Sequence, residues 1–133
     1  QQAGVGIDLT RLLQGYQRLQ NMSDAVVVEG AGGWLVPLND NQSIADLAVK
    51  IKLPVVLVVA IKLGCINHAL LTADSIRSSG LSLAGWVAND FLDDEQHDEI
   101  IQSINARIDA PCLGVVPRLK KADNAGAYLK LMG

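Results

Sequence analysis

The sequence alternates short, wholly apolar segments with amphipathic ones. One apolar segment, residues 53–61, reads LPVVLVVAI and carries no polar side chain on either face of an extended chain. Such a segment is typical of a strand in a parallel sheet, because helices cover both faces of that kind of sheet. We therefore expect an α/β fold, in which strands and helices alternate along the chain.

Turn and capping residues divide the chain into the order α-β-α-β-α-β-α-β-α. Ser43 with Asp46 forms a variant capping box at the start of one helix, and Gly80 marks the end of another. The expected strands are residues 24–30, 53–61, 81–90 and 111–117. The expected helices are residues 7–22, 43–52, 65–80, 93–108 and 123–132. This order predicts a parallel sheet with helices on both faces.

Length and composition indicate a single α/β domain over residues 1–133. Hydrophobic residues make up 50% of the chain and charged residues 19%, so we expect a packed core. A net charge of −3 and a pI of about 5.2 leave no electrostatic basis for nucleic-acid binding. The longest apolar run is far below the ~20 residues needed to cross a membrane. We expect a cytoplasmic protein in which Cys65 and Cys112 are free thiols.

A carboxylate and a glycine-rich loop follow the first expected strand. Glu29 closes the apolar run of residues 26–28, and GAGG follows at residues 30–33. An acid in this place resembles a Walker-B position, where a carboxylate holds Mg²⁺ beside nucleotide phosphates. The glycines would let backbone amides approach a phosphate or a substrate closely. The alternative is an ordinary turn with an exposed acid.

The second strand end, residues 61–67, leads directly into a helix. Gly64 permits a tight turn, and the free amides at a helix start suit a carboxylate or a phosphate. Lys62 could add positive charge. The residues alone leave open an ordinary connection in which Asn67 caps the helix. His68 has no metal-binding partner at suitable spacing and is not expected to be a ligand.

The third and fourth strand ends are polar or irregular. Asn89 can offer both an amide donor and an acceptor, the pattern that pairs with an adenine edge, and Asp90 could support it. Plain turn chemistry is the alternative for this Asn-Asp pair. Pro117 begins a loop that could lie along a base. Ligands of parallel α/β sheets bind beyond the carboxyl ends of the strands, so these positions are candidate binding residues.

Taken together, four stretches resemble dethiobiotin synthetase, an enzyme family of biotin synthesis. They are VVVEGAGGW, KLGCINHALLTADSI, LAGWVAND and LGVVPRL, and the match covers essentially the whole chain. The resemblance implies a P-loop NTPase-like three-layer α/β/α fold, incomplete at the N-terminus. It also implies a Mg²⁺-dependent reaction of 7,8-diaminononanoate, CO2 and ATP that yields dethiobiotin, ADP and phosphate.

The resemblance also implies roles for individual residues. Glu29 would bind Mg²⁺, and Asn89 would read the adenine. The positions matching the family's ATP contacts are Glu29, Gly30, Ala31, Gly32, Asn89, Asp90, Pro117, Arg118, Leu119 and Asp123. The positions matching its substrate contacts are Gly33, Gly64, Cys65, Ile66 and Asn67. Family members are homodimers in which the helix start that matches residues 64–67 reaches the substrate carboxylate of the partner subunit.

One family motif has no counterpart in the sequence. The family begins with a GxxxxGKT loop, followed by a catalytic Lys, and no G-K-[ST] occurs here. We therefore expect the C-terminal portion of such an enzyme, inactive by itself. Two alternatives stay open: a non-catalytic nucleotide-binding or dimerisation module, and a relative of the P-loop amidotransferases of cobalamin synthesis.

Overall fold

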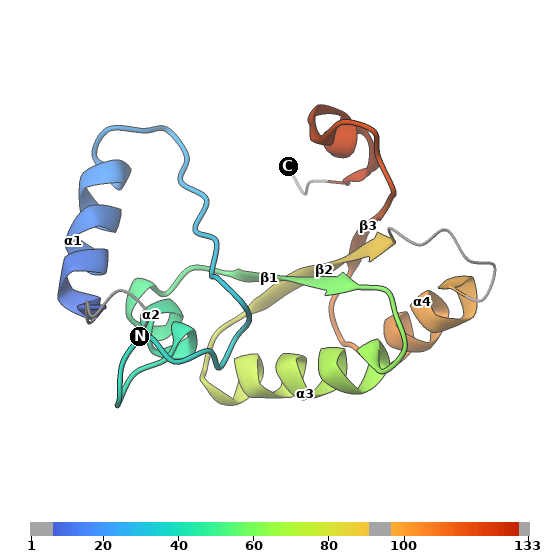
Figure 1. Ribbon diagram of the computed structural model, residues 1–133, viewed down its shortest axis with the longest axis horizontal. Coiled ribbons are helices and arrows are strands. Elements are labelled where there is room, and N and C mark those ends of the chain that lie inside the picture. The colour runs from blue at the N-terminus through green and yellow to red at the C-terminus, as the bar shows by residue number, and fades with distance from the viewer. Residues whose placement is uncertain (1–6, 91–96, 131–133) are drawn as a thin grey trace. The chain divides into compact units, whose positions relative to one another are not determined.

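The computed structural model describes residues 7–90 and 97–130, except for the side chains of Ala122 and Asp123 (Figure 1). The chain divides into two compact units, residues 1–53 and residues 54–133. The first unit carries the glycine-rich loop, and the second carries the sheet. The single domain expected from the length of the chain stays a prediction.

Two capped helices form the frame of the first unit. Helix α1 (Leu9–Gln20) begins after Asp8, whose carboxylate accepts a hydrogen bond from the backbone N–H of Thr10 at 2.8 Å. Helix α2 (Ile44–Ile51) packs against α1 and is preceded by the complete capping box of Ser43 and Asp46. Local capping signals therefore place both helices as the sequence predicts.

The strand predicted at residues 24–30 is wrong. This segment is extended but joins no ladder within the described residues, and Val27 is 94% exposed. A strand is stable only when a neighbour accepts its backbone hydrogen bonds and covers its side chains. The apolar run at residues 26–28 encodes the extended conformation, but the first unit supplies no partner strand among its described residues.

The second unit contains a parallel sheet, which confirms the predicted α/β class. Its strands are β1 (Val55–Ala60), β2 (Leu83–Asp90) and β3 (Cys112–Pro117), hydrogen-bonded in that order. Helix α3 (Cys65–Ser78) connects β1 to β2. Helix α4 (His97–Asn105) precedes β3, and the predicted start of this helix at residue 93 lies outside the described residues.

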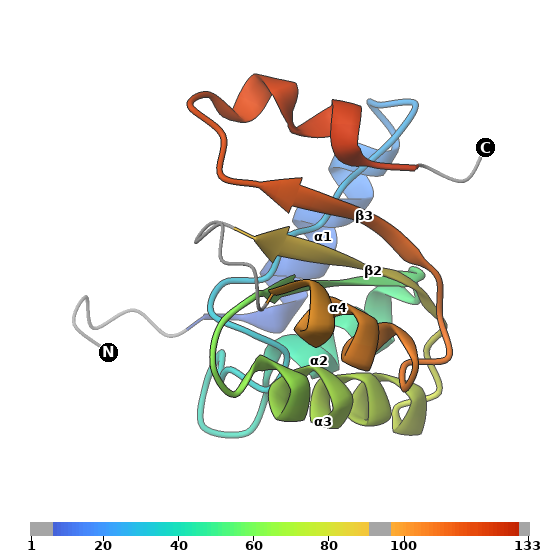
Figure 2. The ribbon, with the colours of Figure 1, turned by 90° about the vertical axis from the view of Figure 1, so that its right-hand side faces the viewer.

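The core of this unit lies between the sheet and the two helices. Figure 1 shows α3 running alongside β1, and Figure 2 shows α4 next to α3. Trp86 and Ala88 of β2 are fully buried there with Ile104 of α4. On the opposite face of β1, Val56 and Val58 are exposed. The helices described in this unit thus cover one face of the sheet.

The last predicted helix differs in form. Residues Ala122–Tyr128 make a 3₁₀-helix, η1, in place of the α-helix expected at 123–132, and residues 131–132 lie outside the described residues. Leu129 then forms an antiparallel bridge with Gly114, and the Lys130 N–H donates to the carbonyl of Leu113 at 2.6 Å. Pairing with β3 requires an extended chain after Tyr128 and so ends the helical turn.

Candidate functional site

The glycine-rich loop is a sharp turn with an acid at its start. Glu29 is exposed, and Gly32 and Gly33 have φ angles of 86° and 142°. These angles lie in the region that glycine adopts without steric cost. The loop therefore depends on glycine at both positions, which an ordinary turn and a ligand-binding loop both require, so the approach to a ligand stays a prediction.

Helix α2 holds the glycine-rich loop in place. The backbone N–H of Ala45 donates to the carbonyl of Trp34 at 2.9 Å, and that of Ile44 donates to Val36 at 3.0 Å. A Cβ added at Gly30 would lie 2.9 Å from the Ile44 side chain. The first amides of α2 thus anchor the residues that follow the loop. Glu29, at the start of the loop, is exposed.

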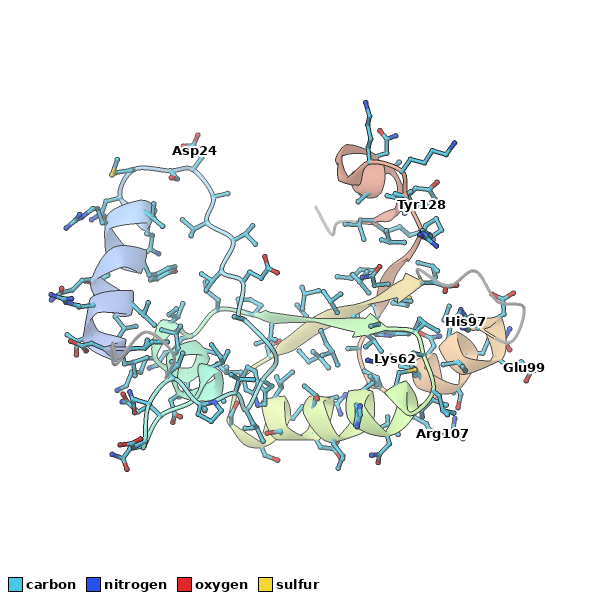
Figure 3. The ribbon with its side chains drawn as sticks, in the orientation of Figure 1. Asp24, Lys62, His97, Glu99, Arg107 and Tyr128 are labelled. Carbon is cyan, nitrogen blue, oxygen red and sulfur yellow. The ribbon has the colours of Figure 1, made fainter. Side chains whose placement is uncertain are left out.

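The start of α3 has the form of an anion-binding helix end. Gly64 is the N-cap residue with φ 86°, and among the described residues no side chain caps this helix. The interpretation of Asn67 as the cap is therefore wrong, because Asn67 lies exposed inside the first turn. The Cys65 N–H donates to the carbonyl of Lys62 at 3.0 Å, and the Cys65 thiol is free and buried. Figure 3 shows Lys62 at the turn before this helix.

Pairing between the strands brings their carboxyl ends to one edge of the sheet. Asn89 is paired with Ala60 of β1 and Val116 of β3, and Asp90 with Pro117. The start of α3 follows β1 directly, so residues 64–67 belong to the same edge. Arg118 is exposed and Leu119 is half-buried beyond β3, while the side chain of Asp123 lies outside the described residues. Glu29 to Gly33 belong to the other unit.

One contact at this edge was missed by the sequence analysis. The Nδ1 atom of His97 lies 2.5 Å from Oδ1 of Asp90, and His97 is 6% exposed. Figure 3 shows His97 at the start of α4. No local pattern predicts the pair, because a single histidine in the first turn of an amphipathic helix has many possible environments.

Few of the described side chains near the candidate site could bind a metal ion. Within the described part of the chain, no group of three or more His, Cys, Asp or Glu side chains could hold a metal ion. Glu29 offers one oxygen-donor side chain of the kind that Mg²⁺ prefers, and Mg²⁺ commonly completes its shell with substrate phosphates and water. Glu29 as a metal ligand beside a nucleotide stays a prediction. Among residues 7–90 and 97–130, no helix is long and apolar enough to cross a membrane.

Comparison with known proteins identifies the family. The family model described as an AAA domain matches residues 1–126. The chain belongs to this family. It is 58% identical to the ATP-dependent dethiobiotin synthetase BioD of Cellvibrio japonicus over 82% of this chain and 49% of the relative. It is 48% identical to BioD of Aromatoleum aromaticum and 46% identical to BioD 1 of Escherichia coli K12, each over 98% of this chain.

These matches confirm the resemblance to dethiobiotin synthetase over most of the chain. The chain spans 49% of the Cellvibrio relative, 59% of the Aromatoleum relative and 60% of the Escherichia coli relative. The carboxyl edge of the sheet and the glycine-rich loop both lie inside the matched residues of the Aromatoleum relative, whose match covers 98% of this chain.

Proposed function

We propose that this chain forms the adenine-binding and substrate-carboxylate-binding part of an ATP-dependent dethiobiotin synthetase. The observation that carries the proposal is the sheet edge where Asn89, Pro117 and the uncapped start of α3 meet. The side-chain amide of Asn89 suits hydrogen bonding to a purine base. The start of α3 suits binding of an anion. The enzyme would act in the cytoplasm.

The nucleotide would lie along the ends of β2 and β3. The exposed Asn89 amide would hydrogen-bond the adenine, and the backbone of residues 117–119 would lie along the base. Glu29 would bind Mg²⁺, which would neutralise phosphate charge when bound. The amides of residues 30–32 would approach the phosphates, and we keep Asp123 as a further nucleotide contact.

The start of α3 would hold the carboxylate of 7,8-diaminononanoate. The Cys65 amide already donates to Lys62, so among the described residues the amides of Ile66 and Asn67 are those of the first turn open to a ligand. We keep Gly33 as a further proposed substrate contact. We propose a homodimer in which residues 64–67 of each subunit complete the site of its partner.

The reaction would proceed in three steps. One substrate amine adds to CO2 and loses a proton, which forms a carbamate. ATP transfers its γ-phosphoryl group to a carbamate oxygen and leaves as ADP. The second amine then attacks the carbamate carbon, loses a proton and expels phosphate, which closes the ring. Since phosphoryl transfer depends on positioned phosphates, and these 133 residues contain no G-K-[ST], we infer that they are inactive alone.

A chimera tests this function. The N-terminal half of the Cellvibrio japonicus relative is joined to these 133 residues, and dethiobiotin formation is measured with 7,8-diaminononanoate, bicarbonate, Mg²⁺ and ATP. We expect the chimera to make dethiobiotin and the 133 residues alone to make none. A folded chimera that binds ATP without forming product would favour the non-catalytic nucleotide-binding module. Product formed by the 133 residues alone would refute the inferred inactivity.

A further inference from the structure

Asp90 and His97 form a short contact at the carboxyl end of β2. Asp90 is the last residue of the strand, His97 is the first residue of α4, and Oδ1 and Nδ1 are 2.5 Å apart. The two side chains are 15% and 7% exposed. When the Asp90 carboxylate is ionised it can only accept, and the hydrogen of this bond is then carried by Nδ1 of His97. Bonds of this charge-assisted kind are among the stronger ones in proteins.

Asn89 and Asp90 serve opposite faces of the sheet. Successive side chains of a strand alternate between faces, and Asp90 follows the alternation of Trp86 and Ala88. Those two residues are fully buried against the helices, whereas Asn89 is exposed. The carboxylate of Asp90 is therefore directed to α4 and bound there, while Asn89 is presented to the other side.

We propose that Asp90 and His97 are positioning residues that lock the end of β2, so that Asn89 is presented in one orientation to the base of a nucleotide. The proposal rests on the proposed function, and it assigns Asp90 to His97 instead of to the nucleotide. Burial makes the lock effective, because removing one partner leaves the other buried without its hydrogen bond.

The physical basis is that Asn89, which would bind the base, is next in sequence to Asp90, which contacts His97. Asn89 is joined to Asp90 by a peptide bond, and the carbonyl of Asn89 accepts a hydrogen bond from the Ile61 N–H at 3.0 Å. The strand end is thus held to β1 and β3 through its backbone pairing and to α4 through the Asp90 side chain. Loss of the contact with α4 would loosen the peptide that orients Asn89.

Nucleotide-free hydrogen exchange of the 133-residue chain tests the lock. His97→Leu removes the donor and keeps an apolar side chain, whereas His97→Asn places an amide nitrogen near the position of Nδ1. We expect exchange at the amides of Asn89 and Asp90 to rise about 10- to 100-fold in His97→Leu, the factor equivalent to one hydrogen bond to a charged group. His97→Asn should restore most of the protection. Exchange in His97→Leu that equals the wild type would overturn the proposal.

A double-mutant comparison separates the lock from general loosening. Asp90→Ala should raise exchange at Asn89 as much as His97→Leu, and the double variant should raise it no further, because both remove one interaction. Additive effects would overturn the proposed pairing. Exchange at the amide of Ile76, a residue of α3 that is 1% exposed, should rise less than exchange at Asn89 in all three variants.

Titration with AMP then separates the lock from the nucleotide site. At millimolar AMP, the side-chain amide resonance of Asn89 should shift in the wild type and in His97→Asn, and shift less in His97→Leu. Inosine monophosphate, whose base edge is altered, is the control. AMP that shifts Asn89 equally in His97→Leu and the wild type would overturn the positioning role. No shift in any protein, with the exchange results as expected, would count against the proposed nucleotide site and leave the lock standing.

Discussion

Tyr128 places its main-chain carbonyl directly against Gly114 of β3, at the spot where any side chain on residue 114 would stand. Leu129 then pairs with Gly114, and Lys130 donates to Leu113. The residues after η1 therefore cover the outer edge of β3. This close crossing holds residues 128–130 against β3.

Gly114→Ala should displace this crossing. The new methyl group would collide with the Tyr128 carbonyl, and we expect a loss of about 1–3 kcal/mol in the free energy of unfolding, the usual cost of overpacking. Urea unfolding measures the loss, and hydrogen exchange at the Lys130 amide should rise with it. The matched control is Gly126→Ala, because a Cβ at Gly126 meets no atom within 4 Å. Equal stability of the two variants would show that the crossing is unimportant.

Helix α3 offers a test of the core on a single element. Ile76 is 1% exposed, whereas Leu71 of the same helix is 61% exposed. Ile76→Ala should cost about 2–5 kcal/mol because it leaves a cavity at a buried position. Leu71→Ala should change stability by less than about 0.5 kcal/mol. Thermal or urea unfolding followed by tryptophan fluorescence makes the comparison, and a large loss for Leu71→Ala would mean that its exposed face is covered in solution.

The capping box predicts a pH dependence in α2. The Ser43 hydroxyl and the Ser43 backbone N–H both donate to Oδ2 of Asp46, each at 2.7 Å, and lower the pKa of that carboxyl below its ordinary value. Because the folded pKa lies below the unfolded one, this contribution to stability is present above the unfolded pKa. It is lost as the pH falls through the folded pKa.

Ser43→Ala should raise the pKa of Asp46 toward its ordinary value, since the hydroxyl hydrogen bond is the largest cause of the shift. NMR titration of the Asp46 carboxyl carbon measures the change. The control is Ser23→Ala, which alters an exposed serine outside the cap. An Asp46 pKa unaffected by Ser43→Ala would contradict the origin assigned to the shift.

Glu29→Gln tests the proposed metal ligand in the chimera. Loss of the carboxylate should lower the rate of dethiobiotin formation by roughly 100-fold or more, comparable to loss of one electrostatic contact to the transition state. Stability should change by less than about 0.5 kcal/mol, because Glu29 is exposed. Asp24→Asn, at an exposed acid of the same segment (Figure 3), is the control and should keep full activity. Full activity of Glu29→Gln would remove this residue from the metal site.

Local signals in the sequence predicted most of the elements. The capping box of Ser43 and Asp46 and the helix end at Gly80 are observed, with Gly80 at φ 81°. The three apolar strands of the sheet are also observed, and so is the placement of Asn89 and Pro117 at its carboxyl edge. These features depend on neighbours in sequence or on the periodicity of one element, so a single chain segment encodes them.

Features that depend on contacts between different elements could not be predicted from the sequence. Residues 24–30 have the composition of a strand, yet composition does not reveal whether another strand lies beside them to pair with. The end of η1 at Tyr128 follows from the bridge between Leu129 and Gly114. The contact of Asp90 with His97 joins a strand end to a helix start.

The sequence by itself determined the parallel α/β class, the family resemblance and the residues at the strand ends, because apolar periodicity, caps and glycine loops act over a few residues. Only the tertiary structure decided which segments pair, which face of β1 the helices cover, and that Asp90 is bound to His97. Those outcomes depend on hydrogen bonds and burial between different elements of the fold, and each has to compensate the conformational entropy lost when the segments are brought together.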